Sequence, residues 1–255
     1  MARTPPRWFV RSRPNPDARV RLICFPHAGA GASVYRLWGP DLAPEVEVAA
    51  VQLPGRESRF TEPAPTDLRA AAEAAADAIE PEVRPPFAVF GHSMGAWLAF
   101  EFTRILESRG SPPVHLFVSG RRAPHTPERF PPMGDLNDDE LVAELDRRGG
   151  GMAPEILANR ELLALLTRTM RADVRAVERY RPIASAPTLT VSLTAFGGID
   201  DRFVSPEELA AWRTTSSAPV AVEMFPGGHF FLHDDRHQVL RTIRTVLLPE
   251  PAPAV

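Results

Sequence analysis

The stretch FAVFGHSMGAWLAFEF, residues 87–102, places a polar Gly-His-Ser-Met-Gly segment between two apolar runs. The first run suits a short buried strand and the second suits a helix. Ser93 lies between Gly91 and Gly95, which matches the G-x-S-x-G nucleophile elbow, a strained strand-to-helix turn that exposes the serine hydroxyl. We therefore interpret Ser93 as a nucleophile on an α/β fold; a glycine-rich tight turn without chemistry is the alternative.

Short apolar runs bounded by glycine or proline recur along the chain and predict the strands of one sheet. They lie at residues 19–25, 46–53, 87–90, 114–119, 189–196 and 220–225. Between the second and third runs, a helical stripe is formed by Leu68, Ala72, Ala75, Ile79 and Val83. Strands that alternate with helices predict a mostly parallel sheet with helices on both faces. A chain of 255 residues is expected to form one domain, residues 1–255.

Residues 124–182 contain helical signals and no good strand. Asn137 followed by Glu140 indicates a capping box at a helix start. One face of a second helix is then marked by Leu163, Leu166, Met170, Val174 and Val177. We expect this helical insertion to form a lid over the site. A peripheral helical hairpin without a part in substrate choice is the alternative.

Composition excludes several classes of function. The formal net charge of −3 provides no basic field to gather nucleic acid. No run approaches the 18 or so apolar residues of a membrane span, and the first ten residues, MARTPPRWFV, lack the apolar core of a secretory signal. We therefore expect a cytoplasmic protein with neither membrane nor nucleic acid as a partner. Cys24 is the only cysteine, so no intrachain disulfide can form.

A serine hydroxyl becomes nucleophilic when a histidine takes its proton and an acid orients that histidine. Of seven histidines, His229 in PGGHFFLHDD follows the strand at 220–225 directly. It therefore lies at the carboxyl end of the sheet, where open α/β sheets build their sites. We predict that His229 is the base. Other roles are expected for the remaining candidates. His233 and His237 are expected to be surface residues or helix caps, His92 to serve in orientation or packing, and His27 to shape a loop.

Two carboxylates, Asp200 and Asp201, follow the strand at 189–196. The spacing Gly198-x-x-Asp201-x-x-Val204 favours Asp201 as the acid. The alternative is that both aspartates are solvated charges on a loop. The chain order Ser93, Asp201, His229 is the order of α/β-hydrolases.

An acyl-transfer site also needs N–H donors for the oxyanion. The residue after the nucleophile, Met94, is expected to provide one. The small residues of HAGAG, residues 27–31, allow close backbone approach, and Ala28 is the predicted second donor. A plain glycine turn is the alternative.

With these residues in place, the chain resembles the type II thioesterases that accompany polyketide and nonribosomal peptide synthases. The resemblance covers nearly the whole length, in FPHAGAG (25–31), QLPGRESRF (52–60), FGHSMGAWLAFE (90–101), LNDDELVAEL (136–145), RADVRAVERY (171–180) and PGGHFFL (226–232). The acid turn of the family usually reads Gly-Gly-Asp-x-Asp-Pro. Here Ile199 and Arg202 replace its first Asp and its Pro, which leaves Asp201 in the matching position.

The resemblance implies that Ser93 attacks a thioester that joins an acyl group to the phosphopantetheine arm of an acyl or peptidyl carrier protein. Such enzymes clear stalled or aberrant acyl units during polyketide or nonribosomal peptide biosynthesis. The substrate carries the phosphopantetheine, so neither a cofactor nor a metal is expected, and the protein is expected to be a monomer. The predicted substrate-binding residues are His27, Leu163, Leu166 and Met170. The alternative for the three residues in the insertion is that they pack between helices as core.

Two other functions remain open from the sequence. One is a carboxylesterase of the same fold that acts on small esters, and the other is a catalytically silent scaffold that binds carriers. The arginine pairs 121–122 and 147–148 are expected to be solvated surface, because arginine is frequent in this sequence, and a docking surface for an acidic carrier helix at either pair is the alternative.

Overall fold

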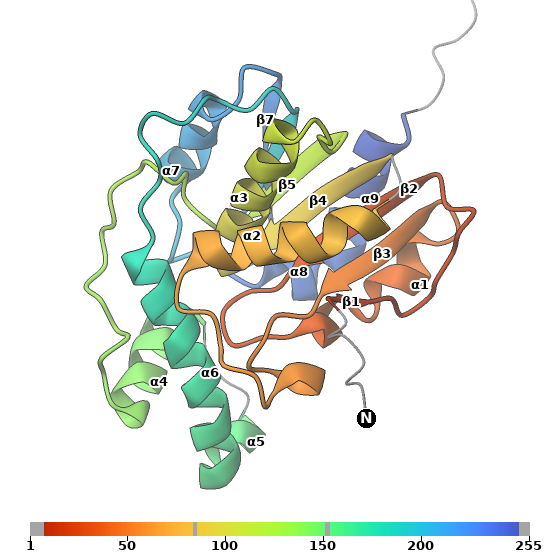
Figure 1. Ribbon diagram of the computed structural model, residues 1–255. Helices are drawn as coiled ribbons and strands as arrows, with labels where there is room; N and C mark the ends of the chain where they lie inside the picture. Colours follow the sequence, from red (N-terminus) through yellow and green to blue (C-terminus); the bar gives the residue numbers. More distant parts are fainter. Residues whose placement is uncertain (1–7, 84–85, 151–153, 250–255) are drawn as a thin grey trace, which may run out of the picture.

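A seven-stranded sheet forms the centre of the computed structural model, which describes residues 8–83, 86–150 and 154–249 (Figure 1). The strand order is β1-β3-β2-β4-β5-β6-β7. All neighbouring strands are parallel except β1, which pairs antiparallel with β3. The strands are β1 (Phe9–Val10), β2 (Val20–Phe25), β3 (Val46–Val51), β4 (Phe87–His92), β5 (His115–Ser119), β6 (Leu193–Gly198) and β7 (Val220–Phe225). The predicted mostly parallel sheet is confirmed.

Helices cover both faces of this sheet. The described helices are α1 (Trp38–Leu42), α2 (Leu68–Ile79), α3 (Met94–Ser108), α4 (Asp138–Arg147), α5 (Pro154–Leu157), α6 (Arg160–Arg179), α7 (Pro206–Ala210), α8 (Phe231–Asp234) and α9 (Arg236–Leu247). None of them combines the length and the apolar character that a bilayer crossing requires.

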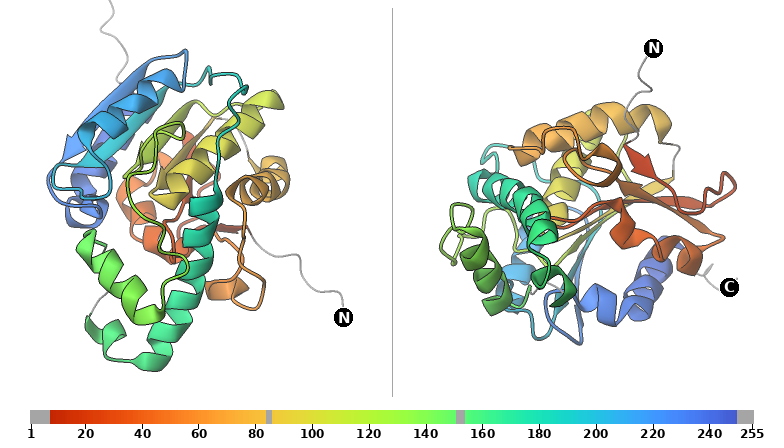
Figure 2. Two further views of the ribbon diagram at one scale, coloured as in Figure 1. Left: turned by 90° about the vertical axis from the view of Figure 1, so that its left-hand side faces the viewer. Right: turned by 90° about the horizontal axis from the view of Figure 1, so that it is seen from below.

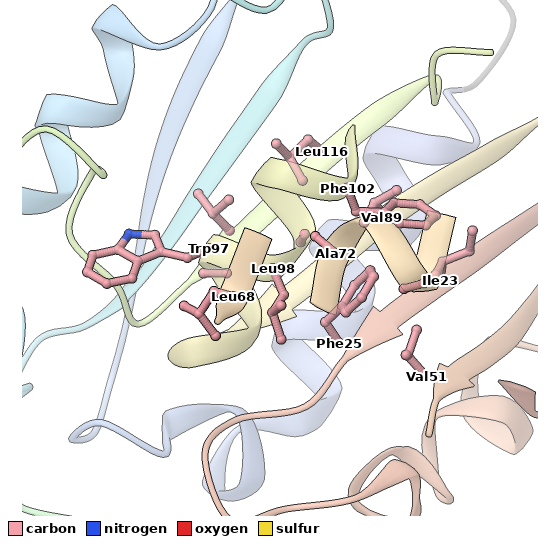
Figure 3. Close-up of a cluster of buried hydrophobic side chains, with 14 of the residues drawn as sticks. Ile23, Phe25, Val51, Leu68, Ala72, Val89, Trp97, Leu98, Phe102 and Leu116 are labelled. Atoms are coloured by element: carbon pink, nitrogen blue, oxygen red, sulfur yellow. The ribbon is translucent and has the colours of Figure 1, made fainter. Parts of the chain in front are cut away.

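The two faces bury separate apolar cores because successive side chains of a strand point to opposite sides. In β2, Ile23 packs into the core beneath α2 and α3, whereas Leu22 packs into the core beneath α1 and α9. Figure 3 shows the first core, where Leu68 of α2 and Leu98 of α3 meet the sheet. These apolar faces fix α3, and with it the turn that precedes it.

The β4–α3 turn holds Ser93 at φ 55° and ψ −117°, a strained conformation for a residue with a side chain. The flanking glycines permit it. A Cβ at Gly91 would lie 1.9 Å from the carbonyl oxygen of Gly95, and a Cβ at Gly95 would lie 2.2 Å from that of Phe25. The predicted elbow is therefore present, and its glycines are required by close backbone contact.

The segment between β5 and β6 contains α4, α5 and α6, and α4 and α6 lie together at one end of the sheet (Figures 1 and 2). Asn137 accepts a hydrogen bond from the Glu140 N–H and Glu140 accepts one from the Asn137 N–H, which confirms the predicted capping box. Asn159 caps the start of α6.

Replacing Gly95 by alanine is expected to lower the free energy of unfolding by about 1–3 kcal/mol or more, because the new methyl group would overlap the Phe25 carbonyl. Urea denaturation measures this change. Gly110→Ala is the control: unlike Gly95, Gly110 has a positive φ, 79°, but a Cβ there meets nothing within 4 Å, so this variant measures the cost of backbone strain without overlap. A Gly95→Ala variant as stable as the unmodified protein would contradict the overlap with the Phe25 carbonyl.

Candidate active site

Three side chains meet at the carboxyl ends of β4, β6 and β7. The Nε2 atom of His229 lies 3.1 Å from Ser93 Oγ, and its Nδ1 atom lies 2.9 Å from Asp201 Oδ2. The tautomer with a proton on Nδ1 satisfies both contacts, because Nδ1–H donates to the carboxylate and Nε2 accepts from the hydroxyl. This geometry suits removal of the Ser93 proton by His229.

The acid turn separates the two candidate aspartates clearly. Asp201 is buried against His229, and its Oδ1 atom accepts a hydrogen bond of 2.7 Å from the Phe203 N–H. Asp200 is exposed, and its N–H donates to the Gly227 carbonyl. The structure thus places Asp201, and not Asp200, beside the histidine.

Two further histidines surround His229. The His92 ring is fully buried with its centre 5.0 Å from the centre of the His229 ring, and its Nδ1 atom lies 2.9 Å from Ser119 Oγ. Burial lowers the pKa of His92 well below 6.5, and burial likewise lowers the pKa of His27 to about 4. Both rings are therefore neutral at pH 7 and place no positive charge beside His229.

The predicted oxyanion donors, Ala28 and Met94, line the same cavity as Ser93 and His229. Met94 is the first residue of α3, where a helix offers its N–H groups no acceptor of its own. Ala28 belongs to the loop after β2. Both N–H groups therefore come from backbone beside the nucleophile, and their role as donors stays a prediction.

A buried ion pair that was not predicted from the sequence holds the loop that contains Ala28. Arg56 donates two hydrogen bonds to the Asp173 carboxylate, at 2.6 and 2.8 Å, and Asp173 also accepts one of 2.8 Å from the Gly29 N–H. The two side chains are only 4% and 2% exposed. Asp173 follows Met170 by three residues, so a carboxylate on the apolar face of α6 was a detectable signal. The pair fastens α6 to the loop beside Ser93.

A cavity of about 660 Å³ opens at Ser93 and extends between α6 and the segment 121–133. Of the predicted substrate-binding residues, His27 and Met170 line it, and their contact with substrate stays a prediction. Leu163 and Leu166 are not among its lining residues, because they lie nearer the start of α6 than Met170 does. Within the described residues, no group of His, Cys, Asp or Glu side chains is arranged to hold a metal ion.

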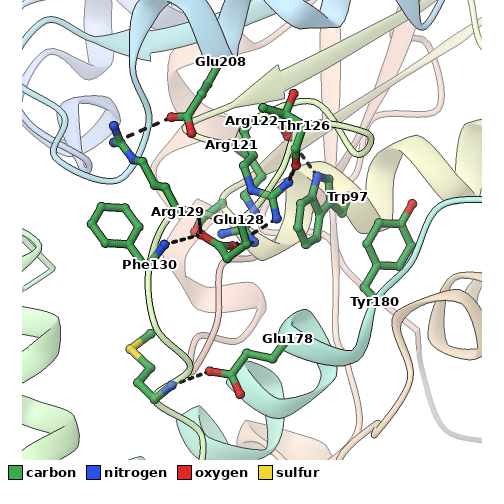
Figure 4. Close-up of polar contacts among 12 residues, drawn as sticks. Trp97, Arg121, Arg122, Thr126, Glu128, Arg129, Phe130, Glu178, Tyr180 and Glu208 are labelled. Carbon is green, nitrogen blue, oxygen red and sulfur yellow. Dashed lines mark hydrogen bonds and ion pairs between the residues drawn. The ribbon is translucent and has the colours of Figure 1, made fainter.

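The expectation that two arginine pairs form surface patches is wrong for three of the four residues. Arg121, Arg122 and Arg148 line the cavity, and Arg147 alone is exposed. Figure 4 shows Arg121 and Arg122 beside Trp97. Both residues come directly after β5, at the end of the sheet that builds the site, and this position was the signal in the sequence.

Several known proteins are similar to this chain in sequence and fold. Residues 20–247 match the family described as thioesterase domain. The gramicidin S biosynthesis protein GrsT of Aneurinibacillus migulanus is 38% identical over 250 residues, 96% of each chain. Thioesterase PikA5 of Streptomyces venezuelae is 41% identical over 246 residues, 94% of this chain and 85% of PikA5. The structure of the type II thioesterase BorB from the borrelidin biosynthetic cluster has a TM-score of 0.87 at 39% identity, covering 94% of this chain and 97% of BorB. The predicted α/β-hydrolase fold is confirmed.

Asp173→Asn is expected to lower the free energy of unfolding by about 3–5 kcal/mol, because it leaves the Arg56 guanidinium buried without a counter-charge. Urea denaturation measures the loss. The matched control is Asp77→Asn, which breaks the exposed pair with Arg109 (2.7 Å) and should change stability by less than about 1 kcal/mol. Equal losses of unfolding free energy in the two variants would contradict the larger effect expected for breaking the buried pair.

Stability is also expected to decrease as pH falls below about 6.5. Unfolded chains then bind protons on His27 and His92 that the folded protein does not bind, so the folded state loses its advantage. For His27 the decrease ends near its folded pKa of about 4. Each neutral histidine contributes up to about 1.4 kcal/mol per pH unit. His92→Gln should reduce the slope of unfolding free energy against pH between 6.5 and 4, and an unchanged slope would contradict the assignment.

Proposed function

Because the chain belongs to the thioesterase family, with type II thioesterases of polyketide and nonribosomal peptide pathways among its relatives, we propose that it hydrolyses acyl groups from carrier proteins. The bond cleaved is the thioester to the phosphopantetheine arm of an acyl or peptidyl carrier protein. Its task is to remove stalled or aberrant acyl units during biosynthesis. The observation that carries the proposal is the hydrogen-bonded series Ser93–His229–Asp201 at the mouth of a large cavity.

In the first half of the reaction, His229 Nε2 takes the proton of Ser93 as Oγ attacks the thioester carbonyl. Asp201 stabilises the imidazolium that forms. The N–H groups of Ala28 and Met94 hold the oxyanion of the tetrahedral intermediate. The carbon–sulfur bond then breaks, and the proton on His229 passes to the departing thiol. An acyl group remains on Ser93.

In the second half, water enters beside His229 and gives up a proton to Nε2 as its oxygen attacks the acyl carbonyl. The same two N–H groups hold the second oxyanion. Collapse returns the proton to Ser93 and releases a free acid. The substrate supplies the phosphopantetheine, so this sequence uses no cofactor or metal of the enzyme.

The helical segment between β5 and β6 is the proposed lid. Met170, Val174 and Val177 of α6 line the cavity and give the acyl group an apolar wall. Asp173, next to Val174 on α6, accepts a hydrogen bond from the Gly29 N–H and so joins this part of the helix to the loop that contains Ala28. Carrier proteins are therefore the proposed partners, with the phosphopantetheine arm entering beside α6. A carboxylesterase acting on small esters is not favoured, since the relatives are thioesterases of biosynthetic pathways.

Ser93→Ala should lower kcat for hydrolysis of carrier-bound acyl groups at least about a thousandfold, because it removes the nucleophile. Asp201→Asn should lower kcat strongly with a smaller effect on KM, since it changes the tautomer and orientation of His229. Mass spectrometry of carriers loaded with acetyl, propionyl, longer acyl and aminoacyl groups measures both effects.

Asp200→Asn is the matched control, because Asp200 is the exposed neighbour of the proposed acid. It should retain the activity of the unmodified protein. Rapid hydrolysis of aryl esters together with no hydrolysis of any loaded carrier would overturn the proposed function in favour of a carboxylesterase.

A further inference from the structure

Two adjacent arginines, Arg121 and Arg122, lie in the wall of the cavity that contains Ser93. Figure 4 shows both side chains close to Trp97 and Glu128. Their guanidinium carbons lie 3.8 and 4.9 Å from the centre of the Trp97 ring. Trp97 belongs to the first turn of α3, directly after the elbow. Two cations are therefore held beside the helix that follows the nucleophile.

These cations are poorly matched by negative charge. The Glu128 carboxylate lies 3.0 Å from Arg122 Nη2 but 3.8 Å from Arg121 Nη2. Arg122 also donates to the Thr126 carbonyl. Glu208 is nearby, but it accepts from the Ser205 N–H and lies 3.6 Å from Arg129. Two guanidinium groups thus share one carboxylate at close range.

Arg121 is the less satisfied of the two. Its Nε and Nη2 atoms are buried and have no hydrogen-bond acceptor among the described residues. The Arg121 side chain is 14% exposed, and that of Arg122 is 10% exposed. Burial, and next the charge of Arg122, lower the pKa of Arg121 to about 10, so Arg121 stays positive at pH 7. The Trp97 ring stabilises this charge but offers no acceptor for its N–H groups.

A buried positive charge whose N–H donors have no acceptor is unfavourable unless an anion neutralises the charge and accepts their hydrogen bonds. We propose that Arg121 binds a carboxylate at the end of the acyl group, so that the enzyme accepts dicarboxylic acyl thioesters of the malonyl or succinyl kind. This inference rests on the proposed function and specifies its substrate class. A planar guanidinium suits a carboxylate because it donates through two parallel N–H groups.

Glu128 indicates where such a carboxylate would lie. Its side chain is 46% exposed, and its carboxylate approaches Arg121 without reaching hydrogen-bond distance. A substrate carboxylate that displaces Glu128 from this position would meet Arg121 directly. Glu128 then competes with the substrate for Arg121, and its removal should favour charged acyl groups.

The phosphate of the phosphopantetheine arm is a poorer fit for this position. It is joined to a serine of a folded carrier, so it stays at the carrier surface during the reaction. Arg121 is instead enclosed in the cavity wall. The acyl end of the substrate, which enters the cavity, is the part that can reach such a group.

The test compares acyl groups of equal shape with and without the charge: malonyl against 3-methylbutanoyl, and succinyl against 4-methylpentanoyl. Each is presented on N-acetylcysteamine, which lacks phosphate, and on a carrier protein. The readout is the ratio of kcat/KM for the charged acyl group to that for its neutral partner. A general loss of folded enzyme lowers both values and leaves this ratio unchanged.

Arg121→Gln should lower the ratio about tenfold to a hundredfold, as expected for loss of a charge-assisted hydrogen bond. Glu128→Gln should raise it severalfold. Arg147→Gln is the matched control, since Arg147 is exposed and outside the cavity lining, and should leave the ratio unchanged.

An unchanged ratio in Arg121→Gln would overturn the subsite. If Arg121 instead bound the phosphate of the arm, Arg121→Gln would lower kcat/KM equally for charged and neutral acyl groups on the carrier and would leave the N-acetylcysteamine ratio unchanged. Absence of any Ser93-dependent thioester hydrolysis would overturn the proposed function separately. In that case, calorimetric Kd values of the paired thioesters with Ser93→Ala still test the subsite. If the charged thioester binds more tightly than its neutral partner and adding Arg121→Gln does not reduce this difference in Kd, the subsite is refuted.

Discussion

The close approach of β4 and α3 is the constraint on which the candidate site depends. Ser93 has a positive φ of 55°, which only a tightly determined turn maintains. That turn exists because Gly91 and Gly95 lack side chains where backbone carbonyl groups lie within 2.3 Å of a Cβ position. The apolar cores on the two faces of the sheet hold the strand and the helix in this contact. Packing thus places the Ser93 hydroxyl at the mouth of the cavity.

A second constraint joins the inserted helix α6 to two loops at the same end of the sheet. The Asp173 carboxylate binds both the Arg56 guanidinium and the Gly29 N–H, so one side chain links α6, the loop after β3 and the loop after β2. A buried ion pair of this kind contributes little net stability but fixes geometry, because either partner alone would be buried with an uncompensated charge. Any movement of α6 as a lid therefore acts on the loop that contains Ala28.

The cavity has walls of two kinds. Met170 and Val174 of α6 offer apolar surface, whereas Arg121 and Arg122 after β5 offer positive charge. Arginine stacked on Trp97 keeps its charge while most of its surface is removed from water. The proposed acyl substrate would therefore meet both apolar and positively charged surface in this cavity.

Six of the seven strands, the elbow and the three residues that meet there could be predicted from the sequence, because apolar runs, glycine spacing and the position of each motif after a strand are local properties. The edge strand β1 was not predicted, because its two residues form no periodic run. The order of motifs along the chain also indicated the family. The tertiary structure was needed to show which side chains of α6 face the cavity: Met170 lines it, while Leu163 and Leu166 do not. It also revealed the contact between Arg56 and Asp173, which are far apart in sequence. Which side chains face the cavity, and which pair between distant elements, depends on how the inserted helices pack against the rest of the protein. No local sequence pattern encodes this packing.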